Sequence, residues 1–90
     1  MLNTPHNPTG KVFTKEELEE ISAILEEYPH VYVLSDEVYD FLTFDNREHH
    51  IFANIGDNYK KTITVFSGGK QLCCTGWKIG WAFAQPEIIR

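Results

Sequence analysis

Lys70 stands in a run of small residues that suits a lysine with a chemical role. The run reads Ser67-Gly68-Gly69-Lys70 and follows a short stretch rich in β-branched residues. A lysine amine attacks a carbonyl only in its neutral form, so its site must desolvate it or place positive charge nearby. Lys78 could supply that charge. Taken alone, Lys70 reads more readily as a loop lysine in solvent, because most lysines are exposed.

A carboxylate and a phenol follow another apolar stretch. Asp36 comes just after the run Val31 to Leu34, and Tyr39 follows Asp36 by three residues. The carboxyl ends of strands are where α/β sheets bind ligands. An aspartate there can pair with a protonated pyridine nitrogen, and a tyrosine hydroxyl can donate to a ring oxygen. The plainer alternatives are a helix N-cap for Asp36 and core packing for Tyr39.

Two turn-forming segments add further polar groups. Asn7 lies in Asn7-Pro8-Thr9-Gly10 and offers an amide at a tight turn. Ser67 offers a hydroxyl, the glycine after it lets the backbone approach a phosphate, and Lys78 adds a charge. Each segment by itself is equally an ordinary turn or a flexible loop.

Together these residues match what pyridoxal phosphate (PLP) chemistry requires of a protein. That chemistry needs an amine for the aldehyde, an acid at the pyridine nitrogen, donors to the ring phenolate and a phosphate cradle. Lys70 is the candidate amine and Asp36 the candidate acid. Asn7 and Tyr39 are the candidate ring donors, and the phosphate candidates are Ser67 and Lys78.

Metal and thiol chemistry have less support in the sequence. His49 and His50 are neighbours, so their side chains point apart, and no third ligand stands at a suitable spacing. We therefore expect no metal site. Cys73 lies near Lys70, but packing is a more common role for such a cysteine than nucleophilic attack.

Composition and charge exclude several classes of function. The net charge of -5 argues against a surface for nucleic acid. No apolar run exceeds four residues, which is too short to cross a bilayer, and no signal-peptide pattern is present. The adjacent Cys73 and Cys74 rarely bridge and read as free thiols in a reducing compartment. We expect a cytoplasmic protein with neither nucleic acid nor membrane as a partner.

The elements that must position the candidate residues form an α/β pattern. A helix is predicted from Lys15 to about Tyr28, with Thr14 and Glu17 as a capping box and Pro29 as its stop. Its apolar residues recur at helical spacing. Residues 37–42 read as a helical turn or a loop, and residues 45–50 as an exposed polar segment.

Three strands are predicted, over residues 31–34, 62–66 and 79–84, and Pro86 opens a further helix. The run Val31 to Leu34 is continuous rather than alternating, which is typical of a strand buried on both faces of a parallel sheet. The order of elements predicts an α/β layer with a partly parallel sheet.

In order and separation, these motifs resemble those of the fold-type I, class I/II PLP-dependent aminotransferases. Among them they are most similar to the kynurenine and glutamine aminotransferases of the cysteine-S-conjugate β-lyase type. The segments that carry the resemblance are residues 3–13, 34–39, 67–70 and 75–78. The resemblance implies that Lys70 is the catalytic Schiff-base lysine. It also implies cofactor contacts by the following residues: Asn7, Asp36, Tyr39, Ser67 and Lys78.

The resemblance further implies transamination between an amino acid and a 2-oxo acid by a homodimeric parent enzyme, with Lys70 as general base at the substrate α-carbon. Residues 1–90 would be the central portion of the large, PLP-binding domain, a mainly parallel sheet with flanking helices that is truncated at both ends. We expect no complete second domain, and we expect the chain alone to be inactive.

Two other functions stay open. One is a non-catalytic α/β module that keeps the PLP-site residues. The other is a PLP-dependent lyase or synthase on the same scaffold. The run Gln71 to Cys74 departs from the small and aromatic residues that are more usual after the lysine.

Overall fold

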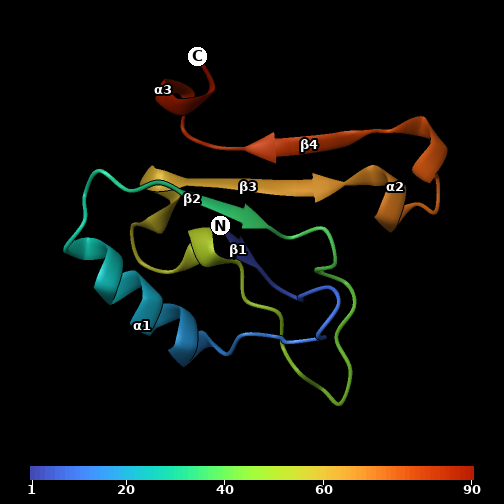
Figure 1. The fold of residues 1–90 in the computed structure, drawn as a ribbon, viewed down its shortest axis with the longest axis horizontal. Coiled ribbons are helices and arrows are strands. Elements are labelled where there is room, and N and C mark those ends of the chain that lie inside the picture. Colours follow the sequence, from blue (N-terminus) through green and yellow to red (C-terminus); the bar gives the residue numbers. More distant parts are fainter.

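The computed structural model describes residues 1–90, which form one four-stranded sheet with helices around it (Figure 1). The strands are β1 (Leu2–Asn3), β2 (Val33–Asp36), β3 (Thr62–Ser67) and β4 (Gly80–Phe83), in that order across the sheet. β1, β2 and β3 run parallel, and β4 runs antiparallel to β3. The predicted α/β layer with a partly parallel sheet is confirmed.

The principal helix, α1 (Lys15–Glu26), begins where the sequence predicts. The Thr14 hydroxyl accepts a hydrogen bond from the Glu17 backbone N–H at 3.2 Å, and the Glu17 carboxylate accepts one from the Thr14 N–H at 2.8 Å. This capping box satisfies two donors that would otherwise lack partners. The helix ends at Glu26 rather than near Tyr28, because the Glu27 N–H already turns back to the Ile24 carbonyl at 3.2 Å.

A small apolar core lies between α1 and one face of the sheet. Leu18, Val33 and Phe52 are its buried hydrophobic residues. Phe52 comes from η1 (Phe52–Asn54), a short 3-10 helix, and a second one, η2 (Asn58–Lys61), precedes β3. No helix is both long and apolar enough to cross a membrane.

The prediction of a strand at residues 31–34 buried on both faces is wrong. The strand runs from Val33 to Asp36, and its side chains alternate between buried and exposed. Leu34 is 38% exposed and Tyr32 is 60% exposed. The core packs only against the face that carries Val33 and Ser35, so Leu34 between them faces solvent.

Three short elements complete the chain. They are α2 (Gly68–Gln71), η3 (Thr75–Trp77) and α3 (Pro86–Ile89). α3 starts at Pro86 as predicted. Residues 37–42 form successive turns, with the Asp40 N–H bonded to the Glu37 carbonyl at 3.0 Å. Residues 45–48 are exposed as predicted, but the His49 side chain is only 11% exposed, so that part of the prediction is wrong.

Candidate cofactor site

The strands β1, β2 and β3 are parallel, so their carboxyl ends lie at the same end of the sheet. Asn3 and Asp36 end β1 and β2 and stand opposite each other in the sheet, and Ser67 ends β3. In Figure 1 the arrowheads of β2 and β3 point to the same side of the molecule as α2 and the loop after β1. Ligands of α/β sheets bind at this carboxyl edge.

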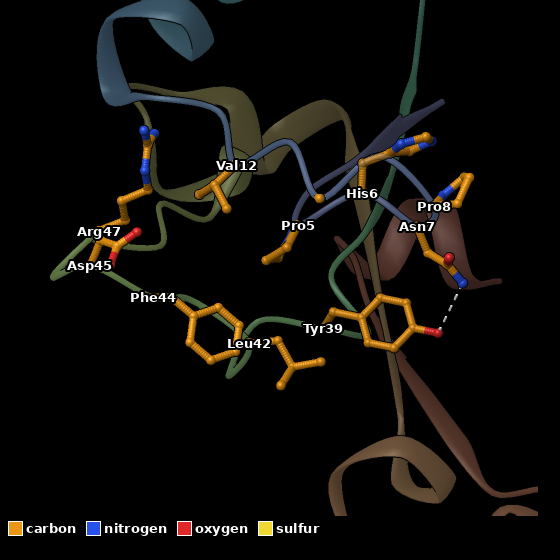
Figure 2. Close-up of a pocket in the computed structure, with 11 residues that line it drawn as sticks. Pro5, His6, Asn7, Pro8, Val12, Tyr39, Leu42, Phe44, Asp45 and Arg47 are labelled. Atoms are coloured by element: carbon orange, nitrogen blue, oxygen red, sulfur yellow. Dashed lines mark hydrogen bonds between the residues drawn. The ribbon is translucent and has the colours of Figure 1, made fainter.

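The structure brings Asn7 and Tyr39 into direct contact. The Asn7 Nδ2 donates a hydrogen bond to the Tyr39 Oη at 3.3 Å, and Figure 2 shows the two side chains turned toward each other. Because the Tyr39 oxygen accepts this bond, its own hydrogen is free to be donated elsewhere. The two residues lie far apart in sequence, so the contact depends on the fold.

Asn3 connects the Asn7 loop to the end of β2. Its Oδ1 accepts a hydrogen bond from the Asn7 backbone N–H at 3.3 Å, and its Nδ2 donates to the Asp36 carbonyl at 3.1 Å. No pattern in the sequence singles out Asn3 for this role. One side chain therefore sets the position of Asn7 relative to Asp36.

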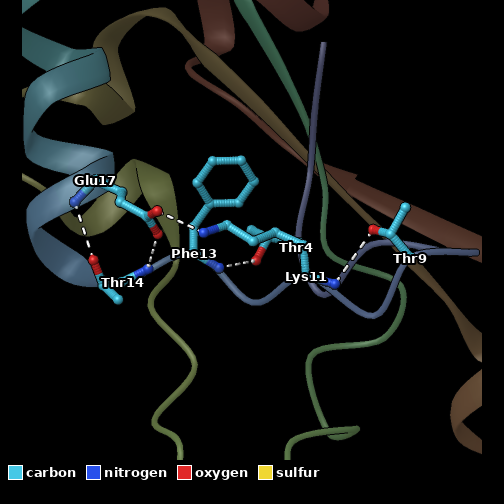
Figure 3. A network of polar contacts seen from close by, with 6 residues as sticks. All are labelled: Thr4, Thr9, Lys11, Phe13, Thr14 and Glu17. Carbon is cyan, nitrogen blue, oxygen red and sulfur yellow. Dashed lines mark hydrogen bonds and ion pairs between the residues drawn. The ribbon is translucent and has the colours of Figure 1, made fainter.

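The loop that carries Asn7 is also fixed at its far end. The His6 N–H bonds to the Lys11 carbonyl at 2.9 Å, and the Gly10 N–H bonds to the His6 carbonyl at 2.7 Å. Gly10 has a φ of 73°, which favours glycine. The Phe13 N–H donates to the Thr4 hydroxyl at 3.2 Å, and Lys11 pairs with Glu17 of α1 (Figure 3).

An open pocket of about 500 Å³ adjoins Asn7 and Tyr39. Its apolar lining includes Leu42 and Phe44, and Arg47 lies at one end (Figure 2). Asp36, Ser67, Lys70 and Lys78 do not line it. The candidate site therefore has two parts in this structure. Asn7 and Tyr39 line the pocket, whereas Asp36 and Ser67 lie at the carboxyl ends of β2 and β3.

Asp36 uses part of its carboxylate to shape the turn after β2. Its Oδ1 accepts a hydrogen bond from the Val38 backbone N–H at 3.3 Å. This bond resembles the helix N-cap that was the alternative role for Asp36. Here, however, the capped segment is a turn and not a helix. The cap fixes the carboxylate at the strand end without consuming all of its acceptor sites.

Ser67 caps the short helix that carries Lys70. Its Oγ accepts a hydrogen bond from the Lys70 backbone N–H at 3.3 Å. Gly68 and Gly69 are buried between them, and a Cβ atom at Gly69 would stand 3.0 Å from the Thr75 Cα. This tight packing of the backbone fixes the position of the Lys70 main chain.

Lys70 and Lys78 are both exposed. Lys78 has a left-handed φ of 52° at the end of η3. The hydrogen bonds of Asp36, Asn7 and Tyr39 involve neither ammonium group. The prediction that Lys78 places charge beside Lys70 therefore stays a prediction. Cys73 is exposed rather than packed, and both cysteines are free thiols, as expected.

Two contacts that sequence reasoning missed tie the site segments together. Gln71 Nε2 donates to Asp40 Oδ1 at 3.1 Å, which links the helix of Lys70 to the turn of Tyr39. Glu37 is completely buried and lies 2.6 Å from His49, measured between Oε2 and Nε2. The burial of Glu37 could have been predicted from the alternation of side chains in β2, because Glu37 falls on the same side as the buried Val33 and Ser35. No sequence pattern points to the Gln71 contact.

Comparisons with known proteins identify the family of the chain. The model of the family "Aminotransferase class I and II" matches residues 1–90. The kynurenine–oxoglutarate transaminase of Dictyostelium discoideum is 49% identical over 90 residues, which are 99% of this chain and 21% of that protein.

Solved structures give the same result. N-succinyldiaminopimelate aminotransferase from Mycobacterium tuberculosis is 43% identical with a TM-score of 0.91, over 98% of this chain and 23% of that one. Cystalysin from Treponema denticola, whose structure contains pyridoxal 5'-phosphate, is 30% identical with a TM-score of 0.89, over 97% and 22% of the two chains. The chain spans about a fifth of the length of the curated relatives it matches. It belongs to the class I and II aminotransferase family.

Proposed function

We propose that these 90 residues form the central part of a PLP-binding domain, and that the complete enzyme transfers an amino group between an amino acid and a 2-oxo acid. The observation that carries the proposal is the Asn7–Tyr39 contact at the strand edge that also bears Asp36 and Ser67. An amide, a phenol, a carboxylate and a hydroxyl at one edge fit the ring and phosphate of PLP in kind.

Each residue has a distinct part in this proposal. Asp36 would hold a proton on the pyridine nitrogen, and Asn7 and Tyr39 would donate to the ring oxygen. Tyr39 can do so because its hydroxyl hydrogen is not used by Asn7. Ser67 and Lys78 would hold the phosphate. When bound, PLP acts as an electron sink for charge that develops at the substrate α-carbon.

Lys70 would carry the cofactor through its ε-amine and then act as the general base that moves the proton at the substrate α-carbon. Lys70 is exposed in this structure, whereas a lysine with this role needs a site that shields it from water. We infer that segments of the complete enzyme beyond these residues cover Lys70.

The similarity to kynurenine transaminases favours kynurenine or a related amino acid as donor. We further propose a homodimer in the cytoplasm, where the free Cys73 and Cys74 would stay reduced. A PLP-dependent lyase on the same scaffold is the second candidate. The products separate the two: a transaminase yields a 2-oxo acid and pyridoxamine phosphate, whereas a lyase yields a cleaved fragment and ammonia.

Cofactor trapping tests the proposal directly. The chain is mixed with PLP, reduced with borohydride and digested, and the pyridoxyl group is located by mass spectrometry. We expect one dominant adduct on Lys70 that is lost in Lys70→Ala. Labelling spread over Lys11, Lys60, Lys61 and Lys78 would contradict a preformed site.

Lys60→Ala provides the matched control. The Asp57 carboxylate accepts a hydrogen bond from the Lys60 ammonium group and, with its charge, raises the pKa of Lys60. Its amine therefore stays protonated and is a poor nucleophile. Removal of Lys60 should leave the adduct on Lys70 unchanged.

A further inference from the structure

Glu37 is completely buried, although it lies between two residues of the proposed site. Asp36 precedes it, Tyr39 follows two residues later, and neither of them is fully buried. A carboxylate removed from water is costly unless close partners compensate for the lost hydration. The partners of Glu37 therefore indicate what the residue does.

Three different segments hold Glu37. The Ser35 hydroxyl of β2 donates to Oε1 at 2.8 Å, and the Glu37 backbone N–H donates to the Val65 carbonyl of β3 at 3.0 Å. His49, from the segment before η1, places Nε2 2.6 Å from Oε2. Two lone pairs at that separation would repel, so the imidazole hydrogen belongs on Nε2. The contact lacks the geometry of a regular hydrogen bond, and His49 Nδ1 has no partner.

These contacts fix the turn that follows β2. The Glu37 carbonyl accepts a hydrogen bond from the Asp40 N–H at 3.0 Å. The same residue thus joins the turn through its backbone and the Ser35 and His49 contacts through its side chain. An apolar side chain of similar size would fill the same space but would leave the Ser35 hydroxyl and His49 without their buried partner. It would not bind Ser35 and His49 at once, and so would not set the orientation of the turn.

We propose that Glu37 is a positioning residue. Its buried side chain, held by Ser35 and His49, orients the turn so that Tyr39 reaches Asn7 and Asp36 stays at the sheet edge. The relevance of this geometry to the cofactor rests on the proposed function. The positioning itself is a property of the chain and is testable without PLP.

The test uses NMR on the full 90-residue chain without cofactor. The Asn7 side-chain amide lies against the Tyr39 hydroxyl, so nuclear Overhauser effects (NOEs) between the amide and the ring report the contact. Glu37→Gln keeps the size of the side chain but removes its charge. Glu48→Gln is the matched control, because the Glu48 carboxylate also lies near a histidine, 3.9 Å from His50, but is 82% exposed.

We expect Glu37→Gln to abolish these NOEs and to shift the Tyr39 ring signals, while Glu48→Gln leaves both unchanged. If Glu37→Gln does not fold, the milder Ser35→Ala removes only one anchor and should weaken the NOEs. A folded Glu37→Gln chain that keeps its NOEs but unfolds at lower temperature would overturn the proposal, because Glu37 would then serve stability alone.

Two further outcomes separate this proposal from the proposed function. A wild-type chain without the NOEs would overturn the positioning role, since there would be no contact to hold. A wild-type chain that has the NOEs, loses them in Glu37→Gln and yet gives no PLP adduct on Lys70 would support positioning and count against cofactor binding by these residues.

Discussion

At Gly69 the chain has no room for a side chain, and Lys70 follows directly. A Cβ atom there would stand 3.0 Å from the Thr75 Cα, a backbone atom that cannot move aside without moving η3. We expect Gly69→Ala to lower the free energy of unfolding by about 1–3 kcal/mol, as overpacking does. It should also displace Lys70 and reduce its PLP adduct. Urea unfolding and the trapping assay measure the two effects.

Gly76→Ala is the control for this prediction. A Cβ atom at Gly76 meets nothing within 4 Å. The substitution should change stability by less than about 1 kcal/mol. Equal losses in the two variants would show that the tight approach at Gly69 does not determine the position of Lys70.

The sequence indicates candidate residues for the site but not the contacts between them. The order of motifs assigns Asn7 and Tyr39 to one site, and the fold places them in contact. The contacts of Asn3 with Asp36 and of Gln71 with Asp40 join segments that are distant in the chain. No local pattern encodes such pairs, because they depend on the register of the parallel strands and on the path of the loops.

Among the elements, α1 has the start that is best defined by side-chain contacts, namely the capping box of Thr14 and Glu17. Because Glu17 titrates, the stability of α1 should depend on pH. The hydrogen bond from Lys11 lowers the pKa of Glu17 most, followed by the bond from the Thr14 backbone. In the unfolded chain the pKa stays near its ordinary value of 4.5. The stabilisation from Glu17 is therefore fully present above pH 4.5 and is lost as the pH falls through the lower folded value.

Glu17→Gln tests this pH dependence. Glutamine also serves in a capping box but does not titrate, so the variant should lose less stability than the wild type between pH 5 and pH 3, about the range of carboxylate titration. Urea unfolding at several pH values gives the comparison. Parallel pH profiles for the two chains would mean that Glu17 titrates alike in the folded and unfolded states. Glu16→Gln, on the same turn of α1, is the control.

Elements with strong local patterns are predicted well, and the others are not. α1 and β3 follow from apolar periodicity, a capping box and β-branched content. β1 has only two residues, and its pairing with β2 defines it, so no local pattern distinguishes it from the loop that follows. β2 lies two residues later than the predicted strand at residues 31–34 for the same reason, since pairing with β3 includes Ser35 and Asp36 in the strand.

At the scale of the whole molecule, the β4 edge of the sheet and many large apolar side chains lack cover. The buried hydrophobic core has only three residues, whereas Leu72, Trp77 and Phe83 are each more than 60% exposed. β4 forms one edge of the sheet, and all four of its residues are exposed. Open strand edges and large apolar surfaces favour association.

We therefore expect the chain to associate with itself and to have a thermal midpoint that rises with protein concentration. Light scattering after gel filtration should give a mass above that of the monomer. Ala82→Lys places a charge on the β4 edge and should shift the chain toward the monomer. Ala23→Lys makes the same change on the exposed side of α1 and should not. A sharp unfolding transition of a monomer, independent of concentration, would mean that the core around Leu18, Val33 and Phe52 is sufficient on its own.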